Sequence, residues 1–528
     1  MRRLFAAALT ALFVLSWLDA VPALAAVRLP PVVLASLRPA AVKAVREAYE
    51  EQGGPLWLAG GAASQSPRAI EIRNLLRDAG REGLVPDDYW VAEIDRLWPA
   101  VQPDARQRLD ALLTVGLLHY LRDLRHGRVP PAAVDPKGTA EPIPFDDAAA
   151  LRGALQVPDL VAYAGGHAPA NPVYRRLRHI LWDYRAVEES GGWPAVPGGP
   201  ALKPGMEDAR VAVLRRRLIA TGDLGDGEAP GRRYDGALVQ AVRHFQRRHG
   251  LADDGIVGPA TLAALNVPVA ARIRQLEINM ERWRWMPDDL GERYILVNLA
   301  GFELEVVELD SAVLRMRVVV GRDYRRTPVF SDRMTYLDFN PTWTVPPSIA
   351  RKDILPKLRR DPGYLAAQHL RVLSGWDPAA HPLDPATIDW RAVSAARFPY
   401  KLVQAPWAGN ALGRVKFVFP NRYNVYMHDT PERELFERSR RAFSSGCIRL
   451  QHPLELAWYL LQDKPGWDRA RIDQVLAEGR TTRVILPQPI PVHLTYSTAW
   501  LAGDGTIEFR DDIYGRDATL AALLYHHT

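Results

Sequence analysis

The first third of the chain carries apolar residues at the spacing of amphipathic helices. Apolar side chains recur three and four residues apart between residues 41 and 124, as on a helix with one buried face. Gly127 and the Pro130-Pro131 pair end the longest of these runs. The pattern therefore predicts a helical domain over residues 27–190. The runs are Ala41, Val42, Val45, Ala48 and Tyr49; Ile70, Ile72, Leu75 and Leu76; and Leu109, Leu112, Leu113, Leu117, Tyr120, Leu121 and Leu124.

A stretch rich in glycine and proline, residues 191–205, separates this domain from a second unit and is predicted to be a linker. Residues 206–267 show helical faces such as Leu238, Val242 and Phe245. Pro259 follows a glycine turn at a position where helices begin. This unit resembles the three-helix type of peptidoglycan-binding domain. On sequence alone, glycan binding and a purely structural spacer role both remain open.

From about residue 292 the pattern changes to the alternation of β-strands. Apolar and polar residues alternate over 302–307 and 314–320, with Asp310-Ser311 between them, which predicts a hairpin with one buried face. The sequence therefore predicts a mostly β domain over residues 290–490. Residues 491–528 are expected to form a C-terminal hairpin, turning at Asp504-Gly505, and a tail.

A segment with little periodicity interrupts this β domain at residues 351–412 and is rich in Pro, Gly, Asp and Trp. Long irregular segments inside compact domains usually have a function. The segment precedes the candidate site described below, so we predict a lid over that site; a helical decoration packed on the sheet is the alternative. The complete pattern predicts a multidomain α+β protein.

The amino-terminal residues have the composition of a secretory signal peptide. A basic start precedes an apolar run from Leu4 to Leu18, and Ala23-Leu24-Ala25 matches a cleavage site. We predict a signal peptide over residues 1–26 and export from the cytoplasm. An uncleaved anchor is the alternative, although Asp19 and Pro22 make the apolar run short for a spanning helix.

Composition narrows the classes of partner. The formal net charge is +6, but the basic residues are scattered among acidic ones and are not clustered with aromatic residues. A nucleic-acid partner is therefore not expected. One cysteine and scattered histidines form no metal-ligand spacing, so no metal and no cofactor are predicted.

The chain's one cysteine, Cys447, follows the small residues Ser444, Ser445 and Gly446. Such residues suit a tight turn, and the apolar residues after Cys447 predict a short strand. We therefore expect an exposed thiol beside bare backbone N–H groups. The N–H groups of Gly446 and Cys447 would then stabilise an oxyanion.

Upstream, His428 ends an alternating run that begins at Tyr423, which predicts a strand whose terminal histidine faces a cleft. A thiol is mostly protonated at neutral pH and needs a basic partner to act as a nucleophile. We therefore predict Cys447 as the nucleophile and His428 as its base. A structural cysteine and an ordinary surface histidine are the alternative interpretation of these two residues alone.

The wider motif resembles that of a known family. His428-Asp429-Thr430 followed by Ser444-Ser445-Gly446-Cys447-Ile448-Arg449 resembles the signature of L,D-transpeptidases with a YkuD-type catalytic domain. The chain is most similar to the large periplasmic members, the YcbB type, over nearly its whole mature length. Many smaller members have histidine where this chain has Ser445, and a small residue where it has Asp429. Agreeing flanks are Gly321-Arg322, Thr327-Pro328, the segment 340–349 and the segment 411–417.

The resemblance implies roles for further residues. The main-chain carbonyl of Asp429 would orient His428, and Tyr426 would contribute to the oxyanion site. A salt bridge is an equal alternative to substrate binding for Arg449, and the two serines are expected to shape the turn and to hydrogen-bond, not to act as nucleophiles. The candidate substrate-binding residues are Arg449, Tyr426, Ser444, Ser445 and Trp343.

The resemblance also implies a substrate. The donor would be a peptidoglycan tetrapeptide stem, cleaved before its terminal D-alanine, and the acceptor a side-chain amine of another stem, giving 3→3 cross-links. Carbapenem-type β-lactams would acylate the same thiol. Hydrolysis of the thioester, lipoprotein attachment and a catalytically silent wall-binding protein remain as alternatives. Other cell-wall synthesis proteins are candidate partners.

Overall fold

The computed structural model describes residues 37–58, 66–136, 138, 143–225 and 231–525. The predicted signal peptide and the terminal His526 and His527 lie outside these ranges. The described chain divides into two compact units: residues 37–58, 66–130, 143–190 and 269–288 form one, and the remaining described residues form the other. Within the described ranges, no helix is both long enough and apolar enough to span a membrane.

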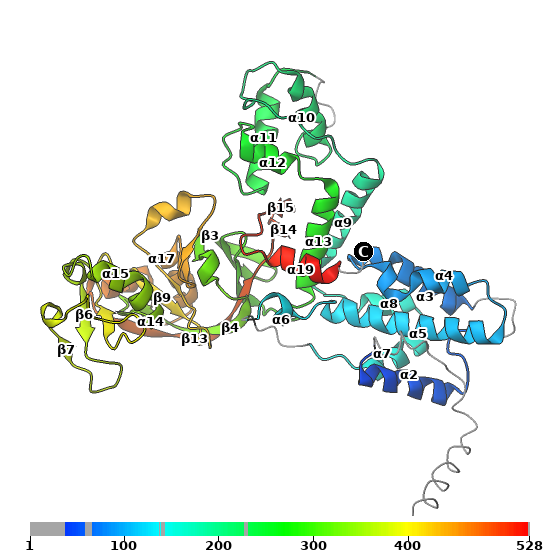
Figure 1. Cartoon of the computed structure of the whole chain (residues 1–528), viewed down its shortest axis with the longest axis horizontal. Coiled ribbons are helices and arrows are strands. Elements are labelled where there is room, and N and C mark those ends of the chain that lie inside the picture. The colour runs from blue at the N-terminus through cyan, green and yellow to red at the C-terminus, as the bar shows by residue number, and fades with distance from the viewer. Residues whose placement is uncertain (1–36, 59–65, 137, 139–142, 226–230, 526–528) are drawn as a thin grey trace, which may run out of the picture. The chain divides into compact units, whose positions relative to one another are not determined.

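The first unit is helical, as predicted. Its longest helix, α5, is buried along most of its length from Leu109 to Leu124, because neighbouring helices cover it on several sides (Figure 1). Its α-helices are α2 (Pro39–Gln52), α3 (Pro67–Arg77), α4 (Val91–Leu97), α5 (Pro103–His126), α7 (Asp147–Gln156), α8 (Leu160–Gly165), α9 (Pro172–Glu189) and α13 (Val269–Trp283), with short 3₁₀ turns η1 (Asp78–Glu82) and η2 (Pro86–Tyr89).

Helix α13 completes this unit although it follows the peptidoglycan-binding-like segment in sequence. It packs against α9 (Figure 1). Just after it, the buried Arg284 donates hydrogen bonds of 2.9 Å to Glu281 and to the Tyr174 hydroxyl on α9. A buried charge needs such partners, because burial without them costs several kcal/mol or more. The helical domain therefore extends beyond its predicted end at residue 190.

The second unit contains the predicted three-helix domain: α10 (Ala209–Ile219), α11 (Gly236–Arg248) and α12 (Pro259–Leu265). Asp208 and Asp235 cap the first two helices by accepting hydrogen bonds from backbone N–H groups. The predicted linker, residues 191–205, contributes to the core of this domain. Val196 and Leu202 are buried in this domain's core, and Asn266 exchanges two hydrogen bonds with the Val196 backbone.

A nine-stranded sheet forms the predicted β domain. Its strand order is β11-β3-β12-β10-β9-β4-β13-β1-β2. The last strand in this order, β2, also pairs with β3 near the other end of the order. The apolar faces of these strands and of helices α17 (Pro453–Leu461) and α18 (Arg469–Ala477) form one core. The strands are β1 (Arg293–Asn298), β2 (Glu303–Glu308), β3 (Ser311–Gly321), β4 (Phe330–Phe339), β9 (Val415–Val418), β10 (Met427–His428), β11 (Ala442–Ser444), β12 (Ile448–Leu450) and β13 (Thr482–Thr495).

The predicted hairpin at 302–320 is confirmed as β2 and β3, which pair antiparallel. Its turn residues Leu309 and Asp310 have φ of 48° and 61°, the left-handed conformation that two-residue hairpin turns use. The predicted domain boundary at residue 490 is wrong, because β13 runs through it as one strand with a bulge between Ile485 and Ile490. The C-terminal hairpin is present as β14 (Ala499–Leu501) and β15 (Ile507–Phe509), but helix α19 (Arg516–Leu524) was not predicted.

The predicted lid segment is a small folded subdomain. A four-stranded sheet in the order β5-β8-β6-β7 starts at Trp343, ahead of the predicted start at residue 351. Val345, Leu355 and Trp390 belong to its own buried core. It is therefore neither an irregular loop nor a purely helical decoration. Its elements are β5 (Trp343–Thr344), α14 (Pro347–Ile349), η4 (Ala350–Ile354), α15 (Leu355–Leu358), α16 (Tyr364–Ala367), β6 (Leu370–Leu373), β7 (Pro382–Leu383), η5 (Pro385–Thr387) and β8 (Lys401–Gln404).

Candidate active site

Strand register brings the predicted nucleophile and base to one face of the sheet. Strands β10 and β12 run parallel, with Met427 opposite Ile448 and His428 opposite Arg449. Met427 and Ile448 are fully buried in the core. Because neighbouring residues of a strand point to opposite faces, the residues flanking this pair face away from the core. Those residues are Tyr426 and His428 on one side and Cys447 and Arg449 on the other.

His428 is buried, and its ring is oriented by its own chain. Its Nδ1 lies 2.5 Å from the main-chain carbonyl oxygen of Asp429, the contact that the resemblance implied. A carbonyl only accepts, so Nδ1 carries the proton and Nε2 is left with the lone pair that a base needs. Burial, aided by the Arg449 and Lys416 charges, lowers the pKa of His428 to about 3, while the Asp429 contact opposes that shift. The imidazole is therefore neutral in the resting protein.

The thiol of Cys447 is partly buried, which corrects the expectation of an exposed group. Its Sγ donates a long hydrogen bond to the Asn424 carbonyl, at 3.8 Å. Burial raises the pKa of the Cys447 thiol above its ordinary value. Hydrogen bonds from Tyr426 to the sulfur, and the positive charges of Lys416 and Arg449, offset part of that rise. The resting site therefore holds a neutral thiol and a neutral imidazole, not a thiolate–imidazolium ion pair.

Tyr426 connects the thiol to Trp343. Its hydroxyl makes hydrogen bonds with the Cys447 sulfur and with the Trp343 side chain, and burial raises its pKa well above the ordinary value. The phenol therefore stays protonated and can donate to a thiolate. An indole N–H only donates, so Trp343 supplies a hydrogen bond to the phenol oxygen. The resemblance assigned both residues to substrate contacts; here they also support the sulfur.

Hydrogen bonds fix the turn before Cys447, and one of them corrects the predicted role of the Gly446 N–H. Gly446 has φ of 119°, which favours glycine. Its N–H donates to Ser444 Oγ at 3.1 Å, so it is already engaged and is not the free oxyanion donor that the sequence predicted. Ser444 Oγ in turn donates to the Cys447 carbonyl at 2.5 Å. Among the described residues no acceptor faces the Cys447 N–H, which leaves that group for an oxyanion.

Hydrogen bonds from a second set of residues hold this turn in place. The sequence did not identify these residues as part of the site. Thr327 Oγ1 donates to the Gly446 carbonyl at 2.9 Å and accepts from the Gly321 N–H at 3.0 Å. Tyr514 donates to the Gly321 carbonyl at 2.6 Å, and Arg516 donates to the Thr327 carbonyl at 3.2 Å. The motif residues Gly321 and Thr327 were the sequence signal for this part of the site. Their partners Tyr514 and Arg516 could not be predicted, because they lie almost two hundred residues away in a segment predicted as a hairpin and tail.

Ser445 and Arg449 both have protein partners. Arg325 donates to Ser445 Oγ at 2.8 Å and to Asp353 of the inserted subdomain at 2.5 Å. Arg449 donates to Glu432 Oε2 at 2.6 Å. Glu432 is half exposed, so this ion pair contributes about 0–1 kcal/mol. Of the two roles predicted for Arg449, substrate binding and a salt bridge, the structure contains the salt bridge.

The carboxylate of Asp429 organises the loops around His428. It accepts hydrogen bonds from the N–H groups of Thr430, at 2.7 Å, and of Arg414, at 2.8 Å, and it pairs with Arg433. Gly413 has φ of 59°, and a Cβ there would lie 2.3 Å from the Asp429 carboxyl carbon. The Ala411–Phe417 motif thus contains a glycine because the carboxylate occupies the space of a side chain.

Substituting Gly413 by alanine is therefore expected to lower both stability and turnover. The left-handed backbone alone costs about 1–2 kcal/mol for a residue with a Cβ, and the clash displaces the residue that orients His428. Thermal unfolding and acylation rate are the measurements. Gly198→Ala is the matched control, since a Cβ there meets nothing within 4 Å. Equal melting temperatures for the two variants would contradict this account of the motif.

The neutral resting pair predicts the pH dependence of thiol alkylation. Only the thiolate reacts with iodoacetamide, and the thiol pKa is raised. The alkylation rate of Cys447 should therefore climb steadily through pH 8 and beyond pH 9, later than for free cysteine. A thiolate–imidazolium pair would instead give a plateau of high rate from acidic pH upward, and such a plateau would disprove the neutral pair.

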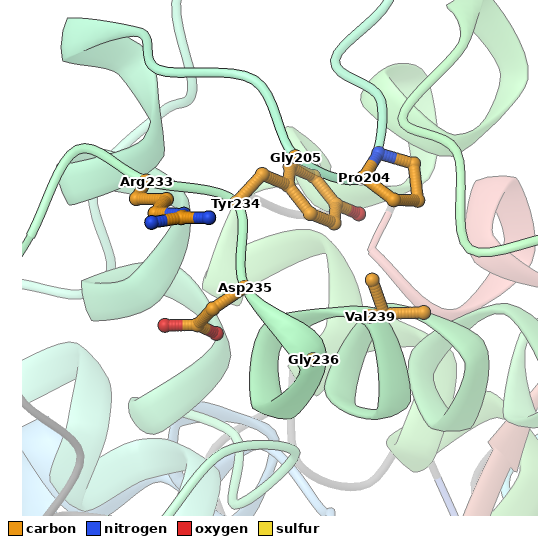
Figure 2. A pocket seen from close by; sticks show the side chains of 7 residues that line it. All are labelled: Pro204, Gly205, Arg233, Tyr234, Asp235, Gly236 and Val239. Carbon is orange, nitrogen blue, oxygen red and sulfur yellow. The ribbon is translucent and has the colours of Figure 1, made fainter.

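A separate pocket of about 450 Å³ lies in the three-helix domain and contains none of the candidate catalytic residues (Figure 2). The Tyr234 hydroxyl donates to the Gly255 carbonyl at 2.8 Å, and Asp235 caps α11 and pairs with Arg215, so these polar groups are already engaged. The pocket lining is Pro204, Gly205, Arg233, Tyr234, Asp235, Gly236 and Val239.

Comparison with known families matches three parts of the chain. Residues 292–484 match the L,D-transpeptidase catalytic domain, residues 43–181 match a family described as "Scaffold domain", and residues 207–265 match a "Putative peptidoglycan binding domain". These matches agree with the predicted order of domains. They do not distinguish the large subfamily from the rest of the family.

Individual proteins are similar to parts of this chain. A "Putative L,D-transpeptidase" of Haemophilus influenzae is 38% identical over 244 residues, covering 46% of this chain and 48% of that protein. This chain therefore spans about half the length of that relative. An N-acetylmuramoyl-L-alanine amidase, CwlL, of Bacillus licheniformis is 46% identical over 68 residues, covering 13% of this chain and 19% of that protein. A solved L,D-transpeptidase of Xylanimonas cellulosilytica is 17% identical, covers 57% of this chain and 99% of that chain, and has a TM-score of 0.17.

Proposed function

Residues 292–484 belong to the L,D-transpeptidase catalytic domain family, and from that premise we propose that this protein is a cysteine acyltransferase that forms 3→3 cross-links in peptidoglycan. One observation carries the proposal. Cys447 and His428 face the same side of adjacent strands, and the His428 ring is fixed by the Asp429 carbonyl at 2.5 Å. That arrangement supplies a nucleophile, a base and an orienting group.

The first half-reaction forms a thioester. Cys447 Sγ attacks the carbonyl of the third residue of a tetrapeptide stem, and His428 Nε2 takes the thiol proton as the C–S bond forms. The Cys447 N–H stabilises the tetrahedral oxyanion, and Tyr426 stabilises negative charge on sulfur. Collapse of this intermediate breaks the amide C–N bond. The proton on His428 passes to the leaving D-alanine amine, so His428 is neutral again.

The second half-reaction transfers the acyl group. The side-chain amine of an acceptor stem attacks the thioester, His428 accepts a proton from the attacking amine, and the C–S bond breaks. The thiolate that leaves recovers that proton from His428. The product is an amide between the third residues of two stems. Water as acceptor would give an L,D-carboxypeptidase, and a lipoprotein amine would give wall attachment.

The domains around the catalytic unit suit a protein that works on the cell wall. We assign residues 207–265 to holding peptidoglycan, in line with the family that they match. The basic start and apolar run at residues 1–26 support export to the periplasm. Membership of the large subfamily rests on the motif Ser444-Ser445-Gly446-Cys447 with Asp429 after His428.

Product analysis tests the proposal. Purified disaccharide-tetrapeptide is incubated with the full protein, and the products are identified by mass spectrometry. A dimer with the mass of two units minus one D-alanine, fragmenting at a 3→3 bond, is expected. A tripeptide product alone would establish the carboxypeptidase alternative. Unchanged substrate, together with retained glycan binding, would establish a catalytically silent wall-binding protein.

A further inference from the structure

Lys416 lies on the catalytic face of the sheet, next to the predicted base. In β9 it pairs with His428 of β10 on one side and with Asp338 of β4 on the other. Its neighbours Val415 and Phe417 are fully buried, so Lys416 faces away from the core, like His428 and Tyr426. Its ammonium lies 4.0 Å from the centre of the Tyr426 ring, and the Tyr426 hydroxyl reaches the Cys447 sulfur.

Among the residues that the structure describes, no carboxylate lies within ion-pair distance of this ammonium, although the charge of Asp338 acts on it from farther away. The nearby Asp338 carboxylate is occupied by Arg483, whose Nε and terminal nitrogen donate to its two oxygens at 2.8 and 3.1 Å. Lys416 is half-buried and rests on an aromatic ring instead. Arg449, the other cation beside His428, differs because it is paired with Glu432. Partial burial of an unpaired cation is costly, which favours binding of an anionic group at this place.

We infer that Lys416 binds the terminal carboxylate of the donor peptide. This inference rests on the proposed function and specifies its donor. In a tetrapeptide, the leaving D-alanine carries a free carboxylate one carbon beyond the scissile nitrogen. The Lys416 charge acts on the Cys447 thiol, so the ammonium lies near the place where a donor is held for attack. In a pentapeptide the same carboxyl group is part of an amide and offers no charge, so Lys416 would select tetrapeptide donors.

Binding at this position would also change the base. Lys416 and Arg449 both act to lower the pKa of His428. A carboxylate on Lys416 cancels one of those two charges, so His428 becomes more basic when a donor with a free carboxylate is bound. When the D-alanine leaves, the ammonium is again unpaired. Recognition of the chain end and activation of the base are thereby coupled through one residue.

Binding of two matched peptides tests the inference without turnover. In a Cys447→Ala background, dissociation constants are measured by calorimetry for a tetrapeptide with a free C-terminal carboxylate and for its C-terminal amide. The free acid is expected to bind about tenfold or more tightly, the gain of one charge-assisted hydrogen bond. Adding Lys416→Met should abolish that preference and Lys416→Arg should keep part of it. Lys43→Met, on the exposed surface of α2, is the matched control and should leave the preference intact.

Equal affinity for acid and amide, no measurable binding of either, or a preference that survives Lys416→Met would overturn the inference. The same peptides given to the otherwise unaltered protein separate this result from the proposed function. Cross-links formed without an acid preference would reject the Lys416 site alone. An acid preference that depends on Lys416, without any cross-links or tripeptide, would reject the acyl-transfer proposal and retain the carboxylate site.

Discussion

Replacement of Cys447 by alanine is expected to leave less than about one per cent of the turnover on tetrapeptide donors, because covalent catalysis has no substitute nucleophile at this site. Ser444 Oγ is committed to the Cys447 carbonyl and Ser445 Oγ accepts from Arg325, so neither hydroxyl is aligned to replace the thiol. Cys447→Ser should be nearly as inactive. An alcohol is far less acidic than a thiol, so His428 has much less nucleophile to generate from serine than from cysteine.

The fold should survive this change. Cys447 is only partly buried, and the turn is held by contacts of Ser444, Gly446 and Thr327 that do not involve the sulfur. Circular dichroism and thermal unfolding should therefore give nearly the same values for the variant and the wild type. Turnover well above one per cent in folded Cys447→Ala would show that another residue is the nucleophile.

Replacement of His428 by alanine is expected to slow acylation by about 10²–10⁴-fold, the range for loss of a positioned general base. The effect should be large here because the thiol pKa is raised and little thiolate exists near neutral pH. The rate of acyl-enzyme formation, followed by mass spectrometry on mixing, is the direct measurement. Part of the loss should be recovered above pH 9, where the thiol ionises without help.

Two controls separate catalysis from folding at this buried position. His428→Gln keeps a polar side chain of similar length and should be as slow as His428→Ala while perturbing the packing less. His452→Ala removes a half-exposed histidine just beyond β12 and should not change the rate. Normal acylation in folded His428→Gln would mean that the base is a different group.

Local patterns predicted those parts of the fold that depend on short-range order. Strand alternation found the β2–β3 hairpin, and helical spacing found α5. The run from Tyr423 was predicted as one strand, but only Met427 and His428 pair, because Asn421 side-chain hydrogen bonds and the left-handed Asn424 fold the preceding residues into a turn. Alternation alone cannot detect such competing side-chain contacts.

The site was predicted less completely, because much of it depends on distant contacts. The positions of Cys447 and His428 followed from local motifs. The engagement of the Gly446 N–H depends on the rotamer of Ser444, which no pattern encodes. Lys416 could have been placed on the catalytic face from its alternation with Val415 and Phe417, but its lack of a counterion depends on the Asp338–Arg483 pair from two other strands.

Intact-protein mass spectrometry with a carbapenem tests the central claim, that Cys447 is an acylated nucleophile. A strained lactam is an activated acyl donor, and opening it at the thiol gives a thioester whose cleaved amine stays attached to the acyl group. An enzyme that waits for an amine acceptor should hydrolyse this thioester slowly, so a long-lived adduct is expected. Wild-type protein should gain one drug mass, peptide mapping should place it on the fragment containing Cys447, and Cys447→Ala should remain unmodified. An unmodified wild type after prolonged incubation, or an adduct on a serine, would contradict the mechanism.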